Sequence, residues 1–314
     1  MAHTGDVIKA SQRTAITVDH PALPPVDRGR LLRSVRRSRM AVVGTIVLLL
    51  VVLVALAGPV LVPQDPVAQN LASALKPPAW EDGGSWAHIF GTDQFGRDIL
   101  ARLVHGARIS LIAAILAAAL GGVVGVLLGL VSGYYGRWAD NVVMRLVDLQ
   151  LAFPLILLAL AMVAVLGPSL KNLVIAMAIT GWTTYARMVR ATVLSLAKRE
   201  FVEAALSIGA RDWTIMLRHI LPNTLAPILV VFTLEMARLV LMEASLSFLG
   251  LGVPPPTPTW GRMLSEGRDY MTVAPWVVFF PGVAIMLLVL GINFLGDGLR
   301  DALDPRLRRI STNG

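Results

Sequence analysis

The chain has 314 residues, of which 55% are hydrophobic and only 15% are charged, a composition typical of membrane proteins. It has no cysteine, which excludes disulfides, thiolate metal sites and cysteine nucleophiles. The net charge of +8 does not indicate nucleic-acid binding, because the cytoplasmic loops of membrane proteins collect Lys and Arg. We therefore expect an all-α integral membrane protein with no nucleic-acid partner.

The N-terminal part divides into a tail, an apolar run and a polar loop. Residues 1–39 are polar and then basic, and we predict a flexible cytoplasmic tail. Residues 40–62 are apolar over the length that a helix needs to cross a bilayer, about 20 residues. Residues 63–107 are rich in Pro, Gly and Trp, so we predict an extracytoplasmic loop there. We expect its Asp93 and Arg97 to fix the loop rather than to bind a substrate.

Five further apolar segments complete a predicted set of six transmembrane helices: residues 109–132, 149–166, 173–187, 225–248 and 275–295. Six spans place both ends of the chain on one side of the membrane. The loops on that side hold 20 Lys and Arg, and the opposite loops hold 7. The positive-inside rule therefore predicts cytoplasmic N and C termini, with residues 297–314 as a cytoplasmic tail.

The second predicted span contains a regular series of glycines. A glycine recurs at every fourth position, at Gly121, Gly125, Gly129 and Gly133. Such a ribbon lets two helix backbones approach closely. The pattern predicts helix packing rather than chemistry.

The loop between the fourth and fifth spans, residues 192–224, is charged and contains residues that are typical of helix ends. Apolar residues at helical spacing after Glu200 predict a short amphipathic helix. Gly209 stands where that helix should end, because glycine tolerates the left-handed cap conformation. We expect Asp212 to cap a second helix and Pro222 to stop it.

The same loop carries a family signature. Glu203-Ala204-Ala205, then Gly209, then Leu221-Pro222 resembles the EAA loop of ABC-importer permeases. The resemblance implies that this loop forms the coupling helices, which dock on a separate ATPase subunit. The coupling residues it implies are Glu203, Ala204, Ala205, Gly209, Ala210, Arg211, Asp212, Leu221 and Pro222.

Three other blocks, residues 91–98, 245–261 and 293–305, resemble the C-type permeases of dipeptide, oligopeptide and nickel importers. The resemblance covers roughly residues 30–308. It implies a MetI-like five-helix permease core, residues 108–296, plus one N-terminal helix. It also implies a bacterial plasma (inner) membrane location. The implied partners are a B-type permease in a heterodimer, two ABC ATPase subunits, an extracytoplasmic substrate-binding protein and the membrane lipid.

The chain has no residues with which to hydrolyse ATP by itself. A phosphate-binding P-loop needs Gly-Lys-Ser/Thr, and none of the four lysines follows a glycine. The five histidines are scattered, and none is paired with an acid at metal-ligand spacing. We expect no catalytic, cofactor-binding or metal-binding residue, with ATP and Mg bound by the partner ATPases.

Three charged residues, Glu235, Arg238 and Glu243, fall inside the fifth predicted span. A charge at that depth is costly, so these side chains should face the bundle or a watery cavity. Glu235 and Arg238 are three residues apart and can pair on one helix face. One interpretation is that all three line a peptide pathway, and the alternative is that the pair is a structural clamp to a neighbouring span.

The family resemblance implies a permease subunit of an ATP-driven importer, which passes peptides or similar small solutes from the binding protein into the cytoplasm by alternating access. The alternative is a secondary transporter or channel driven by an ion gradient, in which intramembrane acids would carry the coupling. A membrane enzyme has little support, because no catalytic constellation is present in the sequence.

Overall fold

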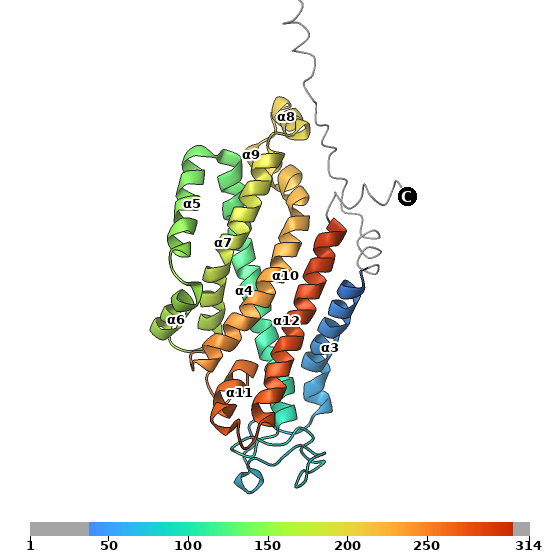
Figure 1. Cartoon of the computed structure of the whole chain (residues 1–314). Helices are drawn as coiled ribbons and strands as arrows, with labels where there is room; N and C mark the ends of the chain where they lie inside the picture. Colours follow the sequence, from blue (N-terminus) through green and yellow to red (C-terminus); the bar gives the residue numbers. More distant parts are fainter. Residues whose placement is uncertain (1–37, 304–314) are drawn as a thin grey trace, which may run out of the picture.

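A computed structural model describes residues 38–303, and its regular elements are helices together with one isolated bridge between Thr92 and Asp98 (Figure 1). The predicted tails lie outside the described residues, except for residues 38–39 and 297–303. Five long helices form the bundle: α3 (Arg39–Leu61), α4 (Ile99–Tyr135), α7 (Leu170–Leu196), α10 (Leu221–Phe248) and α12 (Trp276–Leu303). Helix α4 packs against α7, α10 and α3, while α12 packs against α3 and α10.

Shorter elements connect these helices and close both ends of the bundle. They are η1 (Leu71–Ser73), α5 (Arg137–Leu151), α6 (Leu155–Leu166), α8 (Glu200–Ser207), α9 (Asp212–Thr214), η2 (Ile215–Ile220, a π-helix), α11 (Trp260–Gly267) and η3 (Arg268–Tyr270). Helix α8 lies at one end, and α11 and the loop before α4 lie at the other (Figure 1). The start of α3 and the end of α12 both lie at the α8 end.

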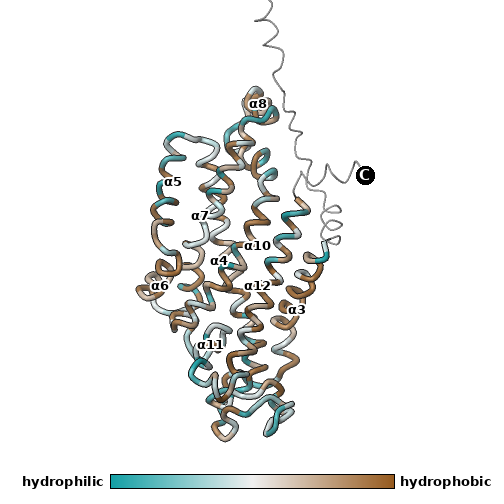
Figure 2. Tube along the Cα trace, viewed as in Figure 1, coloured by the Kyte–Doolittle hydropathy of each residue, from teal (hydrophilic) through white to brown (hydrophobic). Residues whose placement is uncertain are grey.

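An apolar band crosses the middle of the bundle, and hydrophilic residues gather at its two ends (Figure 2). Four helices in the described part of the chain are long and apolar enough to span a membrane: Arg39–Leu61, Ile99–Tyr135, Asp212–Phe248 and Trp276–Leu303. The pair α5 and α6 makes a fifth if it is counted as one broken span. The chain is therefore a multi-pass helical membrane protein.

The third predicted span, residues 149–166, is interrupted at Pro154, as expected from the sequence. Helices α5 and α6 meet at an angle of 87°, and the break contains Pro154, which lacks an N–H and disfavours helical geometry in the residue before it. The fourth predicted span lies within α7, which has 27 residues but falls outside the apolar set. Its C-terminal half carries Thr183, Thr184 and two arginines. The count of six spans stays a prediction.

The glycine ribbon is confirmed as a helix-packing surface. It is the line along which α4 meets α7. A Cβ added to Gly125 would lie 2.2 Å from the carbonyl oxygen of Trp182, and one added to Gly129 would lie 2.7 Å from that of Ala186. Both distances are far inside van der Waals contact. The two backbones can therefore approach this closely only because α4 carries no side chains along this line.

Helix α4 is longer than the predicted span. Its 37 residues correspond to about 55 Å, so it reaches beyond the apolar core of a bilayer, which is about 30 Å thick. It begins inside the predicted loop, where the Asp98 carboxylate accepts the N–H of Ala101 at 2.8 Å as an N-cap.

A buried charge cluster fixes the loop before α4 against α11, as expected for Asp93 and Arg97. The α11 charge cluster consists of Asp93, Arg97, Arg102, Arg262 and Glu266. Arg97 Nε donates to Asp93 Oδ2 at 2.7 Å, and Arg97 Nη2 donates to Glu266 Oε2 at 2.6 Å. Arg102 also bonds to both acids, and Arg262 Nε donates to Glu266 Oε1 at 2.8 Å.

The environment of Glu266 shifts its titration strongly. Burial by itself would raise the pKa of this carboxyl, but Arg102, Arg262 and Arg97 outweigh burial and lower the pKa to about 2. Glu266 is therefore ionised at any ordinary pH, and it holds two otherwise separate parts of the chain together.

Candidate functional site

The predicted helix, glycine and helix arrangement is present at one end of the bundle. Helix α8 ends in a Schellman motif: the N–H of Gly209 donates to Leu206 at 2.9 Å, and that of Ala210 donates to Ala205 at 3.0 Å. Gly209 has φ +76°, a conformation that favours glycine. The chain then turns into α9, so the elbow predicted at Gly209 is confirmed.

Two details of the predicted loop are wrong. Asp212 does not cap the second helix: Arg211 is the N-cap, and the Asp212 carboxylate instead accepts the Tyr134 hydroxyl at 2.9 Å. Pro222 does not stop a helix, because the chain continues without a break from Asp212 to Phe248. The π-helical turn just before Pro222 changes the backbone bonding at the position where the proline lacks an N–H.

One face of this loop is anchored and the other is open. Val202 and Ala205 are buried in a small core that joins the ends of α4 and α7. Three large apolar side chains of the loop are exposed: Leu206 is 50% exposed, Ile208 is 85% exposed and Trp213 is 55% exposed.

The predicted coupling residues mostly lie on the open face. Glu203, Ala204, Gly209, Arg211, Asp212 and Pro222 are exposed, Ala210 and Leu221 are half-buried, and Ala205 is buried. The loop therefore presents an amphipathic surface at the α8 end of the bundle.

Glu235 and Arg238 form the predicted ion pair on one face of α10. Arg238 Nε and Nη2 donate to Glu235 Oε2 at 2.9 and 2.7 Å. Glu235 is buried, whereas the Arg238 side chain is 31% exposed. Helix α7 faces the pair with Gly181, where an added Cβ would lie 3.5 Å from the Glu235 carboxylate.

Glu243 does not join this pair. It lies two turns further along α10, where one carboxylate oxygen accepts the Ser110 hydroxyl at 3.1 Å and the other accepts the Ser247 hydroxyl at 2.7 Å. It is 1% exposed. The geometry of Glu243 favours a structural bond between α10 and α4, and its place in a pathway stays a prediction.

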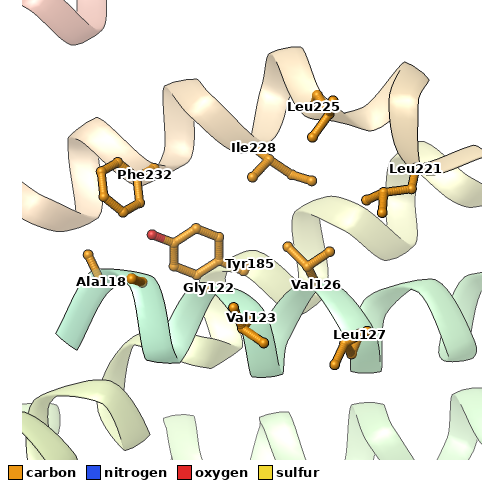
Figure 3. A pocket seen from close by; sticks show the side chains of 11 residues that line it. Ala118, Gly122, Val123, Val126, Leu127, Tyr185, Leu221, Leu225, Ile228 and Phe232 are labelled. Carbon is orange, nitrogen blue, oxygen red and sulfur yellow. The ribbon is translucent and has the colours of Figure 1, made fainter. Parts of the chain in front are cut away.

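Sequence reasoning missed a groove between α4 and α10 (Figure 3). Its volume is about 350 Å³. The floor is the ring of Tyr185, which reaches in from α7. The signal for it was Gly122, which lies outside the glycine ribbon and leaves room for that ring: an added Cβ would lie 3.3 Å from Tyr185 Cζ. The lining residues are Ala118, Ala119, Gly122, Val123, Val126, Leu127, Tyr185, Leu221, Leu225, Ile228 and Phe232.

Tyr185 is unusual among the groove residues. Its side chain is fully buried, and its hydroxyl finds no hydrogen-bond partner among the described residues. Within residues 38–303 there is also no group of three His, Cys, Asp or Glu side chains placed to hold a metal ion.

Comparison with known proteins gives two family matches. The model for "Binding-protein-dependent transport system inner membrane component" matches residues 125–309. The model for "N-terminal TM domain of oligopeptide transport permease C" matches residues 29–78.

Similar curated proteins and solved structures agree with these matches. The chain is 46% identical to the dipeptide transport system permease protein DppC of Alkalihalophilus pseudofirmus, over 88% of this chain and 89% of that protein. It is 48% identical to the glutathione transport system permease protein GsiD of Escherichia coli, over the same shares. A chain of the inward-facing MetNI methionine ABC transporter superposes with a TM-score of 0.53 at 22% identity, covering 65% of this chain and 96% of that chain, which supports the fold.

Proposed function

The chain belongs to the family of binding-protein-dependent transport system inner membrane components, and on this premise we propose that it moves peptides into the cell. It is a membrane-spanning permease subunit of an ABC importer. The observation that carries the peptide assignment is the identity of 46% with a dipeptide permease over 88% of the chain. Glutathione, the solute in the name of a second relative, is itself a small peptide.

We propose that the chain works in a heterodimer with a second, B-type permease, two ABC ATPase subunits and an extracytoplasmic binding protein. ATP and Mg bind to the ATPases, and this chain contributes no catalytic residue. The loop from α8 to α9 docks on one ATPase. The exposed Leu206, Ile208 and Trp213 support this docking, because apolar side chains at a polar end of the bundle gain most from a protein partner.

A movement of the docking loop can pass directly to the transmembrane helices α4 and α7. Val202 and Ala205 of α8 pack on the ends of α4 and α7, which are held together along the glycine ribbon. We propose that closure of the ATPases moves the α4–α7 pair as one body. The central cavity then faces outward to receive solute from the binding protein, and hydrolysis returns it to the inward-facing state.

We propose that six spans place both termini and the α8 loop in the cytoplasm. The third span is the broken pair α5–α6, and the fourth is α7. The 20 to 7 bias of Lys and Arg supports this orientation. In the middle of the fifth span, Glu235 and Arg238 line the pathway, since a partly exposed guanidinium at that depth is unfavourable against lipid.

Transport by the reconstituted complex tests the function. The full complex in proteoliposomes should take up alanyl-alanine only when the binding protein and internal ATP are both present. Uptake driven by an ion gradient without ATP would contradict this and favour a secondary transporter. A complex that takes up neither alanyl-alanine nor glutathione would contradict the peptide assignment.

Labelling of single cysteines tests the orientation. The cysteine-free chain allows Ala87→Cys in the loop before α4 and Ser207→Cys in α8, both at exposed positions. An impermeant thiol reagent on intact spheroplasts should label only the Ala87 position. Labelling of the Ser207 position from outside would invert the topology.

A further inference from the structure

We propose that the groove between α4 and α10 is a solute-binding subsite, with Tyr185 as its specificity-determining residue. This inference rests on the proposed peptide transport. The subsite takes an apolar peptide side chain between its walls, and the Tyr185 hydroxyl, which lies beneath the groove surface in this structure, bonds to the peptide backbone when the groove opens.

The first argument is the state of the Tyr185 hydroxyl. It is fully buried and has no hydrogen-bond partner in the described part of the chain. Buried polar groups are nearly always paired, so an unpaired one asks for an explanation. Phenylalanine would fill the same space without an unpaired hydroxyl. Figure 3 shows this hydroxyl directed toward the end of the groove where Phe232 and Ala118 lie.

The second argument is the continuity of the groove with the intramembrane ion pair. Leu225, Ile228, Phe232 and Glu235 follow one another at steps of three and four along α10, which places them on one helix face. On α7, Tyr185 lies one turn from Gly181, which faces the ion pair. The ion pair therefore lies about one helical turn from the end of the groove that Phe232 lines.

The third argument is chemical fit. A peptide has an apolar side chain, an amide that donates and accepts hydrogen bonds, and charged ends. The accessible surface of the groove is apolar, the Tyr185 hydroxyl lies just beneath it, and the Glu235–Arg238 pair lies one turn beyond Phe232 along α10. A lipid acyl chain would match the walls, but it has no group for the Tyr185 hydroxyl.

The main test is Tyr185→Phe in the full complex, with Tyr270→Phe as the matched control. Loss of one hydrogen bond to the solute should raise the KM for alanyl-alanine uptake about tenfold. Tyr270→Phe should leave KM unchanged. A Tyr185→Phe variant with wild-type KM would overturn the proposal. If the wild-type complex takes up no peptide, the proposed function itself fails first.

Filling and protecting the groove give a second, independent test. Ala119 lies on the exposed side of the groove, so Ala119→Phe should block it without disturbing the core and should abolish uptake. In an Ala119→Cys variant, saturating alanyl-alanine should slow labelling by a thiol reagent, followed on this chain. Normal uptake by Ala119→Phe, or labelling unaffected by peptide, would assign the groove to lipid or to another subunit.

Discussion

The two ends of the helix bundle differ in how they treat charge and apolar surface. At the α11 end, five charged side chains are brought inward and paired with one another. At the α8 end the charged residues of the loop are exposed, and so are Leu206, Ile208 and Trp213. The charge cluster of the first end is paired within this chain, whereas the charged residues of the α8 loop stay exposed beside apolar side chains, as a docking surface requires.

Helix α4 joins these two ends. It starts at the Asp98 cap beside the α11 charge cluster and ends at Tyr135, next to the residue that bonds to Asp212. Between them the glycine ribbon holds α4 against α7. The charge cluster fixes the α11 end, the α8 end is exposed, and α4 and α7 pack closely between the two ends. Such a bundle can transmit a displacement from the α8 end into the membrane. Four substitutions test this difference.

The largest expected effect on stability comes from the close contact between α4 and α7. Gly125→Ala should destabilise the protein by about 3 kcal/mol, because the new Cβ would lie 2.2 Å from the backbone oxygen of Trp182. Thermal unfolding of the purified complex measures this. The control is Gly282→Ala in α12, where the nearest atom is 3.9 Å away. Equal stability of both variants would show that α4 and α7 are not in close contact.

The second largest effect is expected from weakening the α11 charge cluster. The low pKa of Glu266, about 2 against an ordinary 4.5, means that its ionised form stabilises the fold. After allowance for partial solvent screening, this stabilisation is on the order of 2 kcal/mol. It is complete above pH 4.5 and is lost as the pH falls toward 2.

Glu266→Gln should therefore lower the unfolding temperature at pH 7, and its difference from the wild type should shrink as the pH falls from about 5 toward 2. Asp269→Asn, at an exposed position in the same segment, is the control and should change little. A difference between Glu266→Gln and wild type that is constant with pH would rule out ionisation as the cause.

At the Gly209 elbow we expect a smaller effect on stability than in the two preceding variants, but a clear effect on the coupling of ATP hydrolysis to transport. Gly209→Val should cost about 1–2 kcal/mol, because a β-branched residue is strained at φ +76°. The membrane domain should still insert, but substrate-stimulated ATPase activity should fall. Gly209→Asn should retain coupling, because Asn tolerates this conformation and no atom lies within 4 Å of the added Cβ. Normal coupling in Gly209→Val would contradict the proposed role.

The smallest effect on folding is expected on the open surface. Ile208→Asp should change stability by less than about 0.5 kcal/mol, since Ile208 is 85% exposed. Co-purification of the ATPase should nevertheless fall. Ser207→Asp adds the same charge one residue away and should retain the ATPase. Equal loss in both variants would indicate a charge effect rather than an apolar contact.

Local periodicity along single helices was predictable from the sequence. The glycine ribbon, the elbow at Gly209 and the Glu235–Arg238 pair were all predicted correctly, because each depends on residues three to five positions apart. Such spacings fix which side chains share a face before any tertiary contact forms. The family resemblance supported the same elements.

Contacts between distant segments were decided only by the tertiary structure. Asp212 bonds to Tyr134, 78 residues away, instead of capping its own helix, and Glu243 bonds to Ser110, 133 residues away. Pro222 fits into a continuous helix because a π-helical turn precedes it. The Tyr185 groove forms only where α4, α7 and α10 meet. A pattern along one helix gives the direction of a side chain, but the group that it meets depends on how the helices pack together.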